Sequence, residues 1–145
     1  MKALIQRVSQ ASVSVAGEQI SAIGPGMLVL LAVEATDTPA SLSKLVHKVA
    51  HYRLFGDSNS KMNLNVQQIA GAVLVVSQFT LAADTQNGLR PSFTPAADPA
   101  MAEQYYLQFN QQLAGLGIMV QRGRFGADMQ VSLTNDGPVT FLLTS

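Results

Sequence analysis

The chain has 145 residues and a formal net charge of zero, with 48% hydrophobic and only 12% charged residues. This length predicts one domain over residues 1–145, able to bury about 70% of the surface that the unfolded chain exposes. The absence of cysteine excludes disulfides, thiolate metal sites and cysteine nucleophiles. Zero net charge argues against contact with many phosphates along a nucleic acid, but it is compatible with binding one end.

Two features of the sequence predict a cytoplasmic protein. Arg7 stands where a secretory signal peptide would need an apolar run. No stretch approaches the roughly 18 apolar residues of a membrane span. The low charged fraction is also compatible with a stable oligomer.

The first part of the chain predicts three strands. Residues Ala3–Val15 alternate apolar and polar side chains as a long strand does, and Ala16–Glu18 has the composition of a hairpin turn. Glu18–Ile23 would then return antiparallel to the first strand. After the turn signal Gly24–Gly26, the apolar run Met27–Val33 predicts a central strand.

A helix is expected next, because Thr36–Thr38 followed by Pro39 has the form of a helix start. The apolar residues that follow at helical spacing predict the stripe by which this helix lies on the sheet. They are Leu42, Leu45, Val46 and Val49, with Tyr52 or Arg53 at the end. Asp57–Asn65 has the composition of a polar loop.

The second half predicts another buried strand, a second helix and three closing strands. Ala72–Val76 is apolar enough to be buried on both faces, and Ala83–Pro95 is typical of a loop. Asp98 would cap a helix that Gly115 and Gly117 end. Its stripe would be Met101, Tyr105, Phe109 and Leu113, and the closing strands would be Ile118–Arg122, Ala127–Thr134 and Val139–Leu143. The predicted fold is α+β, with two main helices packed on a strongly curled, mostly antiparallel, barrel-like sheet.

Two segments interrupt this apolar pattern with polar residues. Ser77-Gln78-Phe79-Thr80-Leu81 follows directly on a buried strand, and strand ends that open into polar loops are common places for chemistry. Asn135-Asp136-Gly137-Pro138-Val139-Thr140 places a Gly-Pro pair between strand-like flanks, although proline cannot sit in the middle of a sheet ladder. Each alone would be an ordinary strand end or turn. Together they indicate the functional site.

The histidines and hydroxyl groups leave several interpretations open. His47 and His51 are spaced as in the H-E-x-x-H zinc hydrolases, but position 48 is lysine and no third ligand is evident, so an exposed helix face is favoured. Ser77 and Thr80 are candidate nucleophiles without a base nearby in the sequence, and capping of the strand end explains them equally well.

Three charged features are also ambiguous. Arg7 is either a surface residue or a buried donor that fixes a carbonyl or carboxylate. Asp128 and Asp136 fit turn or edge positions better than a catalytic pair. Arg122-Gly123-Arg124 is typical of a solvated turn, and it is also a candidate contact for a phosphate.

The segments Ser77–Ala82 and Asn135–Phe141 resemble the two signature motifs of the D-aminoacyl-tRNA deacylases, the D-tyrosyl-tRNA deacylase family. Paired motifs of this length in the right order are a specific signal. The resemblance extends over essentially the whole chain, and includes Met1–Val8, Lys61–Asn65, Arg90–Phe93 and Gly123–Gln130.

This resemblance implies a cytoplasmic homodimer that hydrolyses the ester between a D-amino acid and the 3′-terminal adenosine of tRNA. It also implies clearance of glycine from mischarged tRNA. Gly137 and Pro138, joined by a cis bond, would enter the active site of the partner subunit and read the chiral centre there. We expect no cofactor, no metal, no membrane and no DNA partner.

The resemblance also implies roles for individual residues. Ser77 and Gln78 would line the site, and backbone N–H groups around Phe79 and Thr80 would form an oxyanion hole. The 2′-hydroxyl of the substrate would orient the attacking water, with Thr80 as nucleophile the alternative. The carbonyls of Gly137 and Phe79 would receive the substrate ammonium. The other substrate-binding residues would be Phe125 and Met129 beside the adenosine, Arg7 bracing the Gly-Pro element, and Ala102 in the pocket wall.

Two alternatives stay open, one also an enzyme and one of a different class. One is a metal-dependent hydrolase that uses His47 and His51, which a chelator would inactivate. The other is a non-catalytic dimeric module that binds RNA ends, in which both signature motifs would be structural.

Overall fold

The computed structural model describes the whole chain, from Met1 to Ser145. Six strands form one curled sheet: β1 (Lys2–Val15), β2 (Glu18–Ile23), β3 (Gly26–Ala32), β6 (Ala72–Ser77), β7 (Met119–Arg122) and β8 (Gln130–Thr144). The two short strands β4 (Phe55–Gly56) and β5 (Met62–Leu64) form a separate sheet. The helices are α1 (Pro39–His51), α2 (Pro99–Gly115) and the 3₁₀ helix η1 (Phe79–Ala82).

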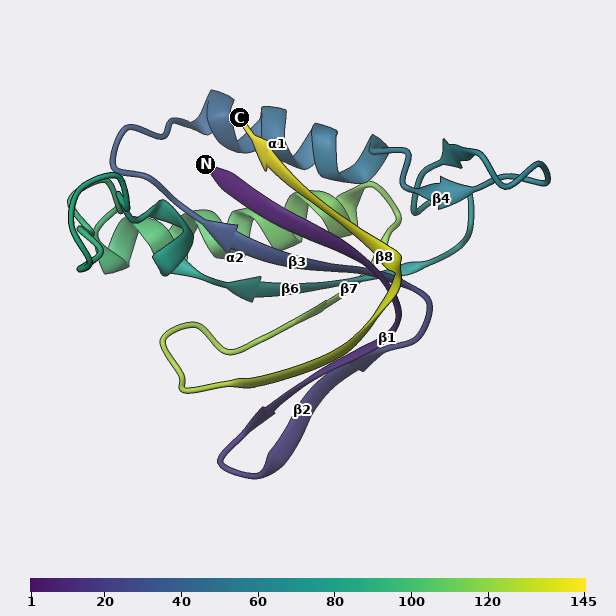
Figure 1. The fold of residues 1–145 in the computed structure, drawn as a ribbon, viewed down its shortest axis with the longest axis horizontal. Helices are drawn as coiled ribbons and strands as arrows, with labels where there is room; N and C mark the ends of the chain where they lie inside the picture. Colours follow the sequence, from purple (N-terminus) through teal and green to yellow (C-terminus); the bar gives the residue numbers. More distant parts are fainter.

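The long strand β1 organises the large sheet, because it pairs with three other strands. Its first half pairs antiparallel with β3, its second half with β2, and β8 runs antiparallel along its other edge. β6 then pairs with β3, and β7 with β6, in parallel. Figure 1 shows the resulting curl. The predicted α+β class and curled sheet are confirmed, and the parallel pairs make the sheet a mixed one.

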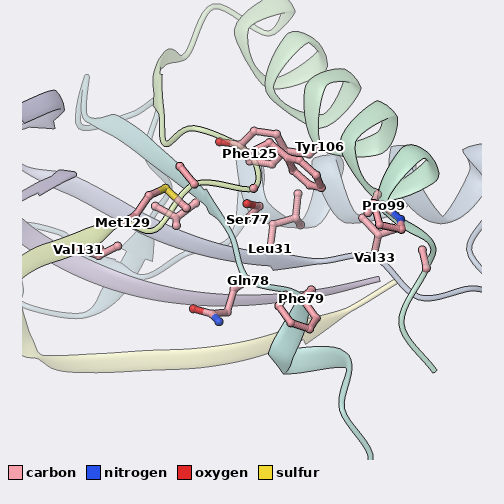
Figure 2. Close-up of a pocket in the computed structure, with 15 residues that line it drawn as sticks. Leu31, Val33, Ser77, Gln78, Phe79, Pro99, Tyr106, Phe125, Met129 and Val131 are labelled. Carbon is pink, nitrogen blue, oxygen red and sulfur yellow. The ribbon is translucent and has the colours of Figure 1, made fainter. Parts of the chain in front are cut away.

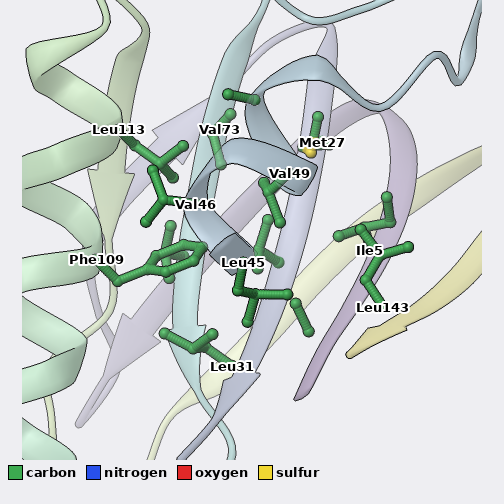
Figure 3. Close-up of a cluster of buried hydrophobic side chains, with 14 of the residues drawn as sticks. Ile5, Met27, Leu31, Leu45, Val46, Val49, Val73, Phe109, Leu113 and Leu143 are labelled. Atoms are coloured by element: carbon green, nitrogen blue, oxygen red, sulfur yellow. The ribbon is translucent and has the colours of Figure 1, made fainter. Parts of the chain in front are cut away.

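Both main helices cover one face of this sheet (Figure 1) and bury a core of 24 residues against it. Figure 3 shows Leu45 and Val49 of α1 gathered with Phe109 and Leu113 of α2 over Val73 of β6. The predicted apolar stripes of both helices therefore form the main core. No helix of the structure is long and apolar enough to cross a membrane.

The inside of the sheet's curl holds a second core of eight buried residues. Strand β6 contributes to both cores, because Val73 and Val75 face the helices whereas Leu74 and Val76 face the inside of the curl. The prediction of a strand buried on both faces is thus confirmed, and it explains why β6 is a rigid support for the segment that follows it.

The starts of both helices are capped by the side chains at the predicted positions. The Thr38 hydroxyl accepts a hydrogen bond from the Ser41 backbone N–H at 3.3 Å and caps α1. A carboxylate oxygen of Asp98 accepts from the N–H groups of Ala100 and Met101, each at 3.0 Å, and caps α2.

The prediction of a polar loop at residues 57–65 holds only in part, because Met62–Leu64 forms β5 and pairs with β4. The reason is local: the Asp57 carboxylate accepts hydrogen bonds from the N–H groups of Asn59 and Lys61 and from the Asn63 amide. These bonds close a tight turn that folds the chain back on itself.

The prediction of separate strands at Ala127–Thr134 and Val139–Leu143 was wrong, because one strand, β8, spans the region from Gln130 to Thr144. Its pairing with β1 jumps from Val8–Asn135 to Gln6–Thr140, so Asp136–Val139 have no partner on β1. The Gly-Pro pair therefore sits in a bulge within one strand, where a missing N–H breaks no ladder bond.

Candidate active site

A cavity of about 470 Å³ opens where β3 and β6 end, between the sheet and the start of α2 (Figure 2). Of its 15 lining residues, 11 are hydrophobic, and the only ionisable side chain among them is Tyr106. The lining comprises Leu31, Val33, Val76, Ser77, Gln78 and Phe79 from the strand ends, Ala97, Pro99, Ala102 and Tyr106 at α2, and Phe125, Gly126, Ala127, Met129 and Val131 before and within β8.

The structure brings several of the predicted site residues together around this cavity. They are Ser77, Gln78, Phe79, Ala102, Phe125 and Met129. Thr80 follows Phe79 in the exposed start of η1 and does not line the cavity, and Gly137, Pro138 and Arg7 lie elsewhere.

The backbone changes direction sharply at the cavity wall. The Gln78 N–H donates to the Leu31 carbonyl oxygen at 2.7 Å and is the last ladder bond before the chain turns into η1. The Leu81 N–H donates back to the Gln78 carbonyl oxygen at 3.2 Å. The N–H groups of Phe79 and Thr80 therefore head the helix and have no carbonyl within it to bind.

The side chains that follow the end of β6 make a hydrogen bond and an aromatic contact. The Gln78 side-chain amide donates a hydrogen bond to the Thr80 hydroxyl oxygen. The Phe79 side chain is 58% exposed, and its ring centroid lies 5.0 Å from that of Phe93. The Gln78 amide is the only hydrogen-bond partner of the Thr80 hydroxyl and is not a base, and no histidine or carboxylate lines the neighbouring cavity.

Tyr106 was missed by the sequence analysis, which assigned the stripe of α2 to its neighbour Tyr105. The Tyr106 side chain is buried, and the carbonyl oxygens of Val75, at 2.9 Å, and Gly123, at 3.2 Å, share the single proton of its hydroxyl. Burial raises the pKa of Tyr106 to about 12. The hydroxyl therefore stays protonated at neutral pH and ties β6 to the segment after β7.

Replacing Tyr106 with phenylalanine is expected to lower the free energy of unfolding by about 1 kcal/mol, since the lost hydroxyl leaves the Gly123 carbonyl short of a donor. The Val75 carbonyl keeps the Gly123 N–H, at 2.9 Å. Urea denaturation would measure the difference. The matched control is Tyr105→Phe, because no protein partner holds the Tyr105 hydroxyl, and equal losses in the two variants would contradict the prediction.

The Gly137–Pro138 bond is cis, and both residues are exposed. Arg7 lies beneath them: its Nε–H donates to the Asp136 carbonyl oxygen at 2.9 Å and lies 3.4 Å from the Asp136 carboxylate. The same guanidinium donates to the Leu54 carbonyl oxygen at 3.0 Å. Arg7 thus joins the bulge of β8 to the chain that follows α1.

This bulge and the cavity lie near opposite ends of β3. Arg7, beside the bulge, pairs with Met27, whereas the cavity begins at Leu31, four residues farther along β3. That offset corresponds to about 13 Å along a strand. Figure 1 shows the bend of β8 opposite the arrowhead ends of β3 and β6. The Gly-Pro pair of one chain therefore does not line the cavity of the same chain.

The two histidines lie on the exposed surface of α1, with ring centroids 4.3 Å apart. The His51 Nδ1 bonds to the His47 carbonyl oxygen at 2.9 Å, and neither ring lines the cavity. Nowhere in the structure do three histidine or carboxylate side chains gather closely enough to hold a metal ion.

Residues 4–144 of the chain match the family model described as D-Tyr-tRNA(Tyr) deacylase. The chain is 63% identical to a D-aminoacyl-tRNA deacylase of Erwinia tasmaniensis and 62% identical to one of Haemophilus influenzae. Each match spans 143 residues and covers 99% of both proteins.

Two solved structures are also similar to this one. The c-Myc DNA unwinding element binding protein superposes with a TM-score of 0.96 at 43% identity, over 100% of this chain and 99% of the other. A probable eukaryotic D-amino acid tRNA deacylase superposes with a TM-score of 0.86 over 98% and 97% of the two chains, and at 15% identity it supports the fold alone. The match over residues 4–144 and the full-length relatives show that the chain belongs to the D-Tyr-tRNA(Tyr) deacylase family.

Proposed function

We propose that this protein hydrolyses the ester bond of D-aminoacyl-tRNA, releasing free D-amino acid and tRNA as a proofreading step of translation. Membership of the family over residues 4–144 carries this proposal. The cavity supports it, because it lies at strand ends and offers apolar walls with a few polar groups, as small-ligand sites do. Such an enzyme would act in the cytoplasm, where aminoacyl-tRNA is used.

The proposed reaction needs little from the side chains. Water adds to the ester carbonyl carbon, and the N–H groups of Phe79 and Thr80 stabilise the negative oxygen that forms. The carbon–oxygen bond to the ribose then breaks, and the departing 3′-oxygen takes up the proton that the attacking water has given up. Tyr106, with a pKa of about 12, is a poor base at neutral pH. The 2′-hydroxyl next to the ester is therefore the group that we propose orients the water.

Selection by chirality is proposed to depend on backbone atoms, since an enzyme that accepts any D side chain cannot use a side-chain pocket. The carbonyls of Phe79 and Gly137 would receive the substrate ammonium only in the D configuration. Glycine, which has no side chain, would pass this filter, and clearance of glycyl-tRNA follows.

The Gly-Pro pair would reach the cavity from a second copy of the chain. The offset of about 13 Å within one chain supports this arrangement, as does the exposure of Gly137 and Pro138. Two large apolar side chains on β8 are also exposed, Leu133 at 36% and Leu142 at 57%. They are candidate contacts of a homodimer.

The proposed nucleic-acid partner is the 3′ end of tRNA alone. Duplex DNA presents a continuous array of phosphate charges, and proteins that bind along it carry an excess of basic residues. This chain has nine basic and nine acidic residues, so we propose no DNA partner.

The test is hydrolysis of matched D- and L-tyrosyl-tRNA by the purified protein, with and without a chelator. We expect loss of the D ester only, at the same rate in both conditions. Equal hydrolysis of both esters would contradict the chiral filter. Inhibition by the chelator would favour a metal site at His47 and His51, and no hydrolysis of either ester would favour the module that binds RNA ends.

Replacing Thr80 with alanine is expected to change kcat by less than about tenfold, because a hydroxyl held by the Gln78 amide and lacking a base is not the nucleophile. Single-turnover hydrolysis of D-tyrosyl-tRNA measures the effect, with Thr80→Ser as the control that keeps the hydroxyl. A loss of about 10⁴-fold in Thr80→Ala alone would identify Thr80 as the nucleophile.

A further inference from the structure

A second hollow lies on the far side of the two aromatic rings that close the active-site cavity. It has a volume of about 910 Å³ and is bounded by α2, β7 and the segment Arg122–Phe125; we call it the arginine groove. Tyr106 and Phe125 line both spaces, and their ring centroids are 5.9 Å apart. Figure 2 shows the two rings side by side at the cavity. They form a wall that the cavity and the groove share.

Two arginines on the lining of this groove form no ion pair with a carboxylate. Arg122 and Arg124 are both exposed, and neither forms an ion pair among those of the structure. Glu103 is the one acidic residue on the lining, so the groove carries a local excess of one positive charge.

The arginines are tied to the active-site cavity through the backbone. The Arg124 N–H lies 3.4 Å from the sulfur of Met129, to which it donates, and Met129 lines the cavity. Between the arginines, the Gly123 N–H donates to the Val75 carbonyl oxygen at 2.9 Å, and the Gly123 carbonyl accepts from Tyr106. The loop that presents both guanidinium groups is therefore held in place beside the cavity.

We infer that the arginine groove holds the single RNA strand that leads to the terminal adenosine, and that Arg122 and Arg124 bind its phosphates. This inference rests on the proposed function. The cavity lining carries no cation to bind the phosphates of such a strand, whereas the lining of the neighbouring groove carries Arg122 and Arg124. A guanidinium matches a phosphate with two parallel hydrogen bonds. Contact with about two phosphates also fits a protein with no net charge that must release its product.

The experiment compares two substrates that differ in their phosphates: D-tyrosyl-tRNA and 3′-O-D-tyrosyl-adenosine, which has none. We expect Arg122→Gln and Arg124→Gln each to lower kcat/KM for the tRNA about tenfold at low salt, mostly through KM. Each substitution should also reduce the slope of log(kcat/KM) against log[salt] by about 0.7. Hydrolysis of the adenosine ester should stay unchanged. The matched control is Arg53→Gln, because Arg53 is exposed but lines neither space.

Several results would overturn the inference. Unchanged hydrolysis of the tRNA in both variants would do so, and so would an equal loss on both substrates, which would place the arginines' effect on the nucleoside. A lower kcat/KM for the tRNA in Arg90→Gln, with no loss in the Arg122 and Arg124 variants, would indicate that the strand leaves the cavity along the loop 83–95 instead. If the wild-type protein hydrolyses neither substrate, the proposed function fails and the inference falls with it.

Discussion

Phe79→Pro is expected to lower kcat for D-tyrosyl-tRNA hydrolysis by about 10²–10³-fold relative to Phe79→Ala, the loss typical of removing one oxyanion donor. Both substitutions remove the ring of Phe79, a residue that is 58% exposed, and only proline removes the backbone N–H. Because Phe79 is the first residue of η1, its N–H makes no bond within the helix that proline would remove. The difference between the two variants therefore isolates the proposed donor.

Single-turnover kinetics with saturating enzyme would measure this difference, since the proposed donor acts on the transition state and KM should change little. Thermal unfolding of both variants serves as the control for structure. Equal rates in Phe79→Pro and Phe79→Ala would show that the Phe79 N–H does not stabilise the developing charge.

Much of the fold could be predicted from the sequence because the determining signals are local. Thr38 and Asp98 predict where the two helices start, and the apolar run Ala72–Val76 predicts that β6 is buried on both faces. The parallel pairing of β6 with β3 and β7 has no such local signal, because it depends on which strands the helices bring together. The continuity of β8 was missed for the same reason: β1 supports the strand across a bulge that the sequence shows only as a Gly-Pro break.

The residues of the candidate site were likewise predictable only in part. Ser77, Gln78 and Phe79 stand out because polar residues end an apolar strand, and the structure places all three at one cavity. Tyr106 gave no signal, because a tyrosine one position off an apolar stripe looks like a surface residue. Its role depends on the carbonyls of Val75 and Gly123, which lie far from it in the sequence.

Gly137→Ala is expected to lower hydrolysis of D-tyrosyl-tRNA at least about 100-fold, because displacement of a positioning group by about 1 Å costs that much. Gly137 has a φ of +138°, and an added Cβ would lie 2.7 Å from Val139 Cγ2 and 3.0 Å from Arg7 Nη2. The bulge must therefore shift and carry its carbonyl groups with it. The matched control is Gly17→Ala, since Gly17 also has a positive φ, +80°, but has open space around it. Unchanged D-ester hydrolysis would contradict a role for the bulge.

A mixed dimer separates action across subunits from action within one. If one subunit carries Gly137→Ala and the other Phe79→Pro, the first keeps an intact cavity and the second an intact Gly-Pro bulge. When the bulge acts on the other subunit's cavity, one complete site forms, and the mixed dimer should show about half of the wild-type rate. When the bulge acts only within its own chain, both sites are defective and activity stays as low as in the parent variants. Co-purification with two different tags and a single-turnover assay would decide between these outcomes, because neither parent homodimer can supply the restored rate.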